Sequence, residues 1–184
     1  VDEDRGALLM TRLMTMAEDI HLTCVGRCWP GIAEQMTELA GEHARRMELV
    51  GIGGHVPFPT IVEYTVRGGW TAGMALFPYR EHYLRKELTK FFEYMAAGLP
   101  VVCSDFPTWK RLVEEHGVGI CVNPDDPEKA LEAVQFLRDH PDERAAMVAR
   151  GRELARTRFN WDHEANKLVK LYSEELFGDA DGAR

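Results

Sequence analysis

Short apolar runs alternate along the chain with longer segments in which apolar residues recur at helical spacing. The apolar runs lie at 22–26, 47–53, 71–77, 100–105 and 118–123. The helical patterns lie at 5–17, 32–45, 60–67, 88–97 and 109–116. Continuously apolar strands are typical of a parallel sheet covered on both faces, and a helix after each strand is what right-handed βαβ units require. The pattern therefore predicts the α/β class, as a Rossmann-like, three-layer domain in which helices flank a parallel sheet.

The end of the chain adds helices to this unit. Helical patterns occupy 127–139, 141–156 and 161–176, and the first two begin at a proline, which is a common helix start. The sequence then closes on GDADGAR, which is small and polar. We therefore expect one domain over residues 1–176, with extra carboxyl-terminal helices, and a flexible tail over 177–184.

The beginning of the chain lacks an expected element. The first residues, VDEDRGALLMTRLM, run from a loop directly into a helix, and no initiator methionine is present. A sheet built from βα units needs a strand before that helix, and no apolar run precedes it. We therefore expect the first strand of the domain to be missing and the chain to be a natural or engineered fragment.

Length and charge narrow the classes of function. The 184 residues can bury one core, and a net charge of −8 disfavours binding to a nucleic acid backbone. The densest basic stretch, 80–90, also contains Glu81 and Glu87, so it suits a small anionic ligand better than a long polyanion. The four tryptophans are scattered rather than striped, which disfavours an aromatic platform for single-stranded nucleic acid.

Cysteine spacing and hydropathy indicate the compartment. No apolar run approaches the roughly 18 residues that a membrane-spanning helix needs. The four cysteines lack the spacing of a metal site, so we expect buried, reduced thiols and a cytoplasmic location.

The stretch 90–105, KFFEYMAAGLPVVCSD, carries the candidate chemistry. One face of the predicted helix holds a packing stripe of Leu88, Phe91, Phe92 and Met95. The opposite face holds Lys90 and Glu93, and residues three apart lie about 5–6 Å from one another on a helix surface. A cation and a carboxylate are thus expected side by side at a helix start.

That helix start is an anion site in its own right, because first-turn N–H groups lack partners within the helix. A diphosphate could lie over the first turn beside Lys90 while Glu93 accepts hydrogen bonds from ribose hydroxyls. The alternative is a solvated pair of Lys90 and Glu93, worth about a few tenths of a kcal/mol. Ser104 and Asp105 follow the next strand, at the sheet edge where ligands of parallel sheets bind.

Three motifs in order make the sequence recognisable: E-x-M-A-x-G-x-P-V-V from Glu93, G-x-x-V-x-P-x-D from Gly119 and R-F-x-W from Arg158. With them, nearly the whole chain resembles the carboxyl-terminal domain of the family 4 glycosyltransferases (glycosyltransferase group 1). The resemblance implies one half of a GT-B fold. It also implies a nucleotide-diphosphate sugar along the carboxyl edge of the sheet.

The resemblance also implies roles for single residues. Glu93 matches the glutamate that binds ribose, and Lys90 with the amides of Leu88 and Thr89 matches the phosphate-facing helix start. Arg5, before Gly6, stands where the family has the lysine of a Lys-Gly pair that reaches the diphosphate.

A second segment is expected to meet the nucleotide base. Gly54, His55 and Val56 match the loop that lines the base in the family. His55 could equally be a surface loop residue that does not contact the base.

The implied function is the donor-binding half of a retaining glycosyltransferase in polysaccharide biosynthesis. Arg5 and Lys90 would stabilise the leaving diphosphate, and no Asp-x-Asp pair is present, so we expect no metal and no cofactor. The acceptor site would lie in a missing amino-terminal domain. Peripheral association of the full-length enzyme with the inner membrane face is left open.

The sequence departs from the family at one functional position. The first glutamate of the family's E-x7-E motif would fall at Arg85, so a carboxylate for the donor sugar would have to come from Glu81 or Glu87. Two alternatives therefore remain. The chain could be half of a GT-B sugar-nucleotide epimerase, or a noncatalytic GT-B-like subunit that serves as an interaction domain.

Overall fold

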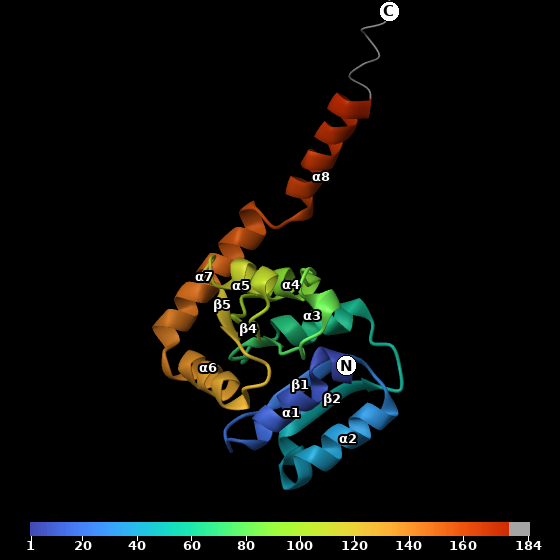
Figure 1. The fold of residues 1–184 in the computed structure, drawn as a ribbon, viewed down its shortest axis with the longest axis vertical. Helices are drawn as coiled ribbons and strands as arrows, with labels where there is room; N and C mark the ends of the chain where they lie inside the picture. The colour runs from blue at the N-terminus through green and yellow to red at the C-terminus, as the bar shows by residue number, and fades with distance from the viewer. Residues whose placement is uncertain (177–184) are drawn as a thin grey trace, which may run out of the picture.

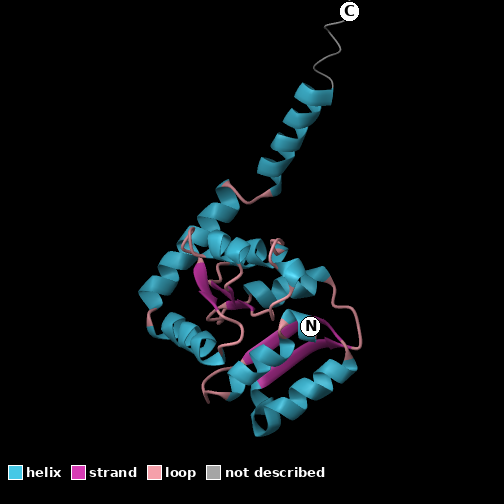
Figure 2. Cartoon of the chain, in the orientation of Figure 1, coloured by secondary structure: helices cyan, strands magenta, loops and turns pink. Residues whose placement is uncertain are grey.

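A computed structural model describes residues 1–176, which form an α/β fold of parallel strands flanked by helices. The strands are β1 (Leu22–Cys28), β2 (Met47–Ile52), β3 (Gly73–Ala75), β4 (Val101–Ser104) and β5 (Gly119–Val122). They form two parallel sheets, β1–β2 and β3–β4–β5, which Figure 2 shows as separate groups of magenta arrows. The predicted fold class is confirmed, but the strands do not form one continuous sheet.

Helices connect the strands and continue beyond the last one. They are α1 (Ala7–Thr15), α2 (Pro30–Ala40), α3 (Phe58–Val66), α4 (Thr89–Ala97), α5 (Pro107–Val113), α6 (Pro127–Asp139), α7 (Pro141–Thr157) and α8 (Trp161–Leu171). Three 3₁₀ turns lie at Glu3–Arg5, Gly41–Arg46 and Glu81–Tyr83, and a π-helical turn lies at Tyr172–Leu176. Every predicted strand and helix is present, and most of them have shifted ends.

The shifted ends have local causes. Pro30 and Pro107 each occupy the first helical turn, where a fixed φ and a missing N–H suit a helix start, so α2 and α5 begin two residues earlier than predicted. Gly6 has φ of 75°, so α1 begins after it and Arg5 lies in a 3₁₀ turn rather than in the helix. The last predicted helix, 161–176, changes from α to π geometry at Tyr172.

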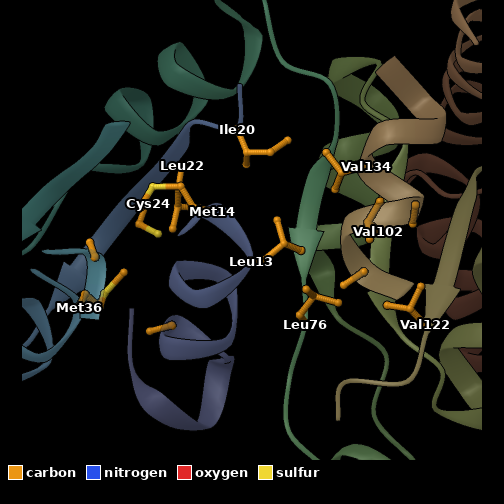
Figure 3. Close-up of a cluster of buried hydrophobic side chains, with 14 of the residues drawn as sticks. Leu13, Met14, Ile20, Leu22, Cys24, Met36, Leu76, Val102, Val122 and Val134 are labelled. Atoms are coloured by element: carbon orange, nitrogen blue, oxygen red, sulfur yellow. The ribbon is translucent and has the colours of Figure 1, made fainter. Parts of the chain in front are cut away.

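A first core cluster holds the two sheets together through α1. Figure 3 shows Leu13 of α1 on the side of Leu76, which follows β3, and Met14 on the side of Leu22 and Cys24 of β1. All five of these side chains are buried. Because α1 packs on both sheets, burial of its apolar side chains joins them into one body.

A second core cluster lies between β3, β4, α4 and α5. Phe91 and Met95 of the predicted packing stripe are buried in it. Trp109 is its largest buried side chain, and its Nε1 donates to the carbonyl of Lys86 at 2.6 Å. The cluster therefore fixes α4 against the sheet, as the sequence predicted.

The carboxyl-terminal helices differ in their packing: α7 packs on the rest of the domain, and α8 extends away from it. α7 packs on α4, where Gly151 brings the two helices close together at Met95. α8 projects away from the rest of the described chain (Figure 1), and Trp161 and Val169 on it are 74% and 63% exposed. Within residues 1–176, no helix is both long and apolar enough to cross a bilayer. The tail predicted at 177–184 lies outside the described residues.

Candidate functional site

A cavity of about 640 Å³ lies at the join between the two sheets. This volume is within the range of roughly 300–1,000 Å³ that small-molecule pockets occupy. The cavity is lined by residues from the amino terminus, β1, β3, α3, α4 and the loop after β2. The predicted site residues among its lining are Arg5, His55, Val56, Thr89, Lys90 and Glu93. The fold thus brings together segments that lie far apart in the sequence.

Leu88, whose amide is predicted to bind the diphosphate, does not line the cavity. Its side chain packs against the second core cluster. Its backbone is the N-cap of α4, in an extended conformation, and no side chain caps the helix start there. The Leu88 carbonyl accepts the amide of Phe91 at 3.1 Å. The first amides of α4, beginning at Thr89, are therefore uncapped donors beside the cavity.

Arg5 reaches the cavity because Gly6 turns the chain tightly against the end of β3. A Cβ atom on Gly6 would stand 1.5 Å from the carbonyl oxygen of Leu76, so only glycine fits. The guanidinium of Arg5 lies 3.4 Å from the carboxylate of Asp2 and its side chain is 61% exposed. Such an exposed pair is worth roughly 0–1 kcal/mol, so an anionic ligand can replace Asp2 at little cost.

Lys90 lies half-buried on the cavity wall. Burial lowers the pKa of Lys90 and the charge of Arg5 lowers it further, while Glu93 acts in the opposite direction. Within the described residues, no salt bridge joins Lys90 to Glu93, and the charge of Glu93 acts on Lys90 without direct contact. A half-buried ammonium without a bonded carboxylate favours binding of an anion.

The loop after β2 forms another part of the wall. Val56 is buried and lies against Gly51, where an added Cβ atom would stand 2.3 Å from Val56 Cγ2. His55 is exposed and lines the cavity beside it. The loop thus offers one fixed apolar side chain and one exposed ring.

Aromatic side chains in the cavity wall were missed by the sequence reasoning. Trp29, Tyr64 and Trp70 line it. The guanidinium of Arg67 lies 4.3 Å from the Tyr64 ring centre and 4.6 Å from that of Trp70. Trp70 Nε1 also donates to the carbonyl of Tyr64 at 2.8 Å. These rings give the cavity flat apolar surfaces on which a planar group can stack.

Ser104 and Asp105 hold the fold and do not line the cavity. The buried Ser104 hydroxyl donates to the carbonyl of Phe77 at 2.7 Å and accepts its amide at 2.8 Å. Asp105 accepts the Tyr79 hydroxyl at 2.5 Å, and this hydrogen bond raises the pKa of Tyr79 to about 12. The expectation that Ser104 and Asp105 face a ligand is therefore not met, because the loop after β3 uses both side chains.

The charged loop before α4 is exposed. Glu81, Arg85 and Glu87 all lie there, and none of them is among the residues that line the cavity. In the part of the chain that the structure describes, no cluster of three His, Cys, Asp or Glu side chains could hold a metal ion. The four cysteines carry free thiols.

Comparisons with known proteins show the family. A family model described as glycosyl transferase-like matches residues 5–170. The phosphatidyl-myo-inositol mannosyltransferase of Mycobacterium leprae is 28% identical over 166 residues, which are 87% of this chain and 39% of that protein. A GDP-mannose:cellobiosyl-diphosphopolyprenol alpha-mannosyltransferase of Xanthomonas oryzae pv. oryzae is 33% identical over 84 residues, or 46% of this chain and 22% of that protein.

The fold has a counterpart among solved structures. Sucrose-phosphate synthase from Thermosynechococcus elongatus matches with a TM-score of 0.79 at 22% identity, over 97% of this chain and 44% of that chain. The chain spans less than half the length of these relatives. The family resemblance seen in the sequence is confirmed, and the chain belongs to the glycosyl transferase-like family, as a group 1 glycosyltransferase domain of GT-B fold.

Proposed function

We propose that the cavity binds a nucleotide-diphosphate sugar and that the chain is the donor-binding half of a retaining glycosyltransferase. The observation that carries this proposal is the position of Lys90, which lies half-buried beside the uncapped start of α4. Arg5 is close enough for its charge to lower the pKa of Lys90. Two cations and a helix N-terminus converge there on one small region, which suits the two phosphates of a nucleoside diphosphate.

Each part of the donor has a candidate partner. The diphosphate would accept hydrogen bonds from the amides of Leu88 and Thr89 and from Lys90 and Arg5. Glu93, one turn along α4, would accept from the ribose hydroxyls. The base would lie against His55, Val56 and the aromatic wall formed by Trp29, Tyr64 and Trp70.

The same cations would act in the reaction. Negative charge develops on the departing diphosphate, and positive groups already in place stabilise it without reorganisation. Arg5 and Lys90 would supply this stabilisation, so we propose transfer that needs no metal. A missing amino-terminal domain would supply the acceptor, in a cytoplasmic enzyme.

GDP-mannose is the first donor to test. The relative from Xanthomonas oryzae is named for that donor, and the relative from Mycobacterium leprae is named a mannosyltransferase. We propose by analogy that the chain accepts a mannose donor, with guanine as the base.

Calorimetric titration of the purified chain with GDP, UDP and ADP tests the proposal. We expect saturable binding in the range of roughly micromolar to millimolar Kd, strongest for GDP. Transfer of mannose by the chain alone is expected to be negligible, because the acceptor is not positioned. The absence of saturable binding for all three nucleotides would overturn the donor-site proposal and favour an interaction domain.

A further inference from the structure

Two of the four thiols lie side by side on neighbouring strands. Cys103 of β4 and Cys121 of β5 are register partners in the parallel sheet, and their Sγ atoms lie 3.5 Å apart in a thiol–thiol hydrogen bond. Both side chains pack in the second core cluster, so they lie on the same face of the sheet. Neither residue lines the cavity, so the proposed donor site makes no use of this pair.

The backbone around Cys103 and Cys121 fits a disulfide without rearrangement. Neighbouring strands lie about 4.8 Å apart, which is within the roughly 4.4–6.8 Å between Cα atoms that a disulfide spans. A disulfide places its sulfurs about 2.05 Å apart, so the two Sγ atoms must approach each other by about 1.5 Å. Ladder pairs on both sides hold the two backbones in place. Rotation of the two side chains is therefore sufficient to join the sulfurs.

The other two cysteines do not have this geometry. Cys24 and Cys28 lie four residues apart on one strand, β1. A strand rises about 3.3 Å per residue, so their Cα atoms are roughly 13 Å apart, well beyond the limit of about 7 Å for a disulfide. Cys24 also packs in the first core cluster, away from Cys103 in the second. The fold thus favours one pairing of thiols over the others.

Cys121 is the thiol of the pair that a solute meets first. Cys103 is 0% exposed, whereas Cys121 is half-buried on β5, an edge strand of its sheet within residues 1–176. The amide of Cys121 donates to the exposed carboxylate of Glu114 at 3.3 Å. The hydrogen bond to Cys121, together with burial, raises the pKa of Cys103. Cys103 therefore keeps its proton near neutral pH and does not react first.

We infer that Cys103 and Cys121 form a redox modification site, a dithiol that an oxidant of the peroxide class closes to a disulfide between β4 and β5. The sulfur of Cys121 first attacks one peroxide oxygen. The O–O bond breaks, Cys121 becomes a sulfenic acid, and the other oxygen leaves as water with the thiol proton. The sulfur of Cys103 then attacks the sulfenic sulfur, the S–O bond breaks, and the departing hydroxide takes the proton of Cys103. The two sulfurs together lose two electrons, which reduce one hydrogen peroxide to two waters.

The disulfide would act on stability and not on donor binding. The two cysteines lie 18 residues apart in the sequence, and the loop between them contains α5. A cross-link across this loop restricts the unfolded chain, so the oxidised form is expected to melt about 5 °C or more above the reduced form. Nucleotide affinity is expected to be the same in both forms, because neither thiol lines the cavity.

Oxidation of the native 184-residue chain with hydrogen peroxide tests the inference. The reduced chain, once unfolded, should react with four equivalents of a thiol reagent, and the oxidised chain with two. Mass spectrometry should show the loss of two hydrogen atoms from the intact chain and a link between Cys103 and Cys121 in its digest. Dithiothreitol should reverse both the link and the rise in melting temperature.

Two variants and an unfolded control separate this site from general thiol oxidation. Cys121→Ser should abolish the link and the rise in melting temperature, whereas Cys24→Ala combined with Cys28→Ala should keep both. Oxidation in urea should give a mixture of links, because only the fold selects the pair.

The decisive result comes from the unsubstituted chain, so it does not depend on whether a variant folds. Four thiols that remain free in the treated native chain would overturn the inference. Links between chains or to Cys24 or Cys28 would do the same, and so would conversion of Cys121 to a sulfinic acid without a link. Equal mixtures of links in the native and urea-treated chains would also contradict it.

Discussion

Gly6 lies so close to the carbonyl oxygen of Leu76 that a Cβ atom on Gly6 would stand 1.5 Å from it. Gly6→Ala would add this clash to a left-handed φ of 75°, which by itself costs an L-residue about 1–2 kcal/mol. We expect a loss of at least about 2 kcal/mol in the free energy of unfolding, and weaker nucleotide binding because Arg5 moves. Urea denaturation measures the first effect.

Gly31→Ala is the matched control for that variant. Gly31 lies in α2 with nothing within 4 Å of an added Cβ atom, so alanine is expected to stabilise the chain by up to about 1 kcal/mol. Equal stabilities of the two variants would show that the contact between Gly6 and Leu76 does not constrain the chain.

Lys90→Met is expected to stabilise the fold near neutral pH. The pKa of Lys90 is lowered by burial, so the folded state binds this proton less tightly than the unfolded state does. The charged form therefore destabilises the fold below the lowered pKa, and this cost vanishes as the pH rises toward the ordinary value of 10.5. Denaturation at pH 7 and above pH 10 should show a gain at the lower pH that disappears at the higher one.

Lys129→Met should have the opposite effect and lower the stability of the fold near neutral pH. The hydrogen bond to Glu132 raises the pKa of Lys129, so its charged form is favoured in the folded state. A gain in stability at pH 7 for Lys129→Met as well would show that removal of any lysine from this acidic chain is stabilising, and would contradict the account of Lys90.

Asp105→Asn tests the contact between the residue that follows β4 and the loop after β3. The carboxylate of Asp105 accepts the Tyr79 hydroxyl and raises the pKa of Tyr79 to about 12. The stabilisation from this hydrogen bond is present below pH 10, the ordinary pKa, and is lost as the pH rises through 12. In Asp105→Asn, the phenolate absorbance of Tyr79 should appear at a lower pH, closer to 10. An unchanged titration would contradict the contact.

Trp109→Ala is expected to cost about 3–5 kcal/mol of stability, because it empties the centre of the second core cluster and leaves the Lys86 carbonyl without its donor. Trp161→Ala, at a side chain that is 74% exposed on α8, should change stability by less than about 0.5 kcal/mol. Guanidinium denaturation compares the two. A loss for Trp161→Ala as large as that for Trp109→Ala would contradict the described packing.

The positions of strands and helices could be predicted because each apolar run and each helical period is local to a short stretch of sequence. The buried face of α4 could be predicted in the same way, and Phe91 and Met95 are buried as expected. Helix ends were less predictable, since Pro30 and Pro107 start helices earlier than the apolar spacing alone indicates. Division of the strands into two sheets depends on pairing between distant segments, which no local pattern encodes.

The candidate site was predictable only where one stretch or the family resemblance carried it. Lys90 and Glu93 stand on one helix, so their common place in the cavity wall could be expected. Trp29 and Trp70 come from separate connections, and their scatter along the sequence hid their shared position. Ser104 was misjudged because its buried hydrogen bonds to Phe77 are made by a loop whose path the sequence does not reveal.

The binding of GDP to paired variants of α4 and α6 tests the donor site most directly. Lys129 and Glu132 have the same spacing as Lys90 and Glu93, are joined at 2.6 Å and lie outside the cavity lining. Lys90→Ala and Glu93→Ala should each weaken GDP binding at least tenfold, which corresponds to a loss of about 1.4 kcal/mol of binding free energy. Neither variant is expected to have a lower melting temperature. Lys129→Ala and Glu132→Ala should leave the affinity unchanged. Unchanged GDP affinity in both α4 variants would contradict the donor site.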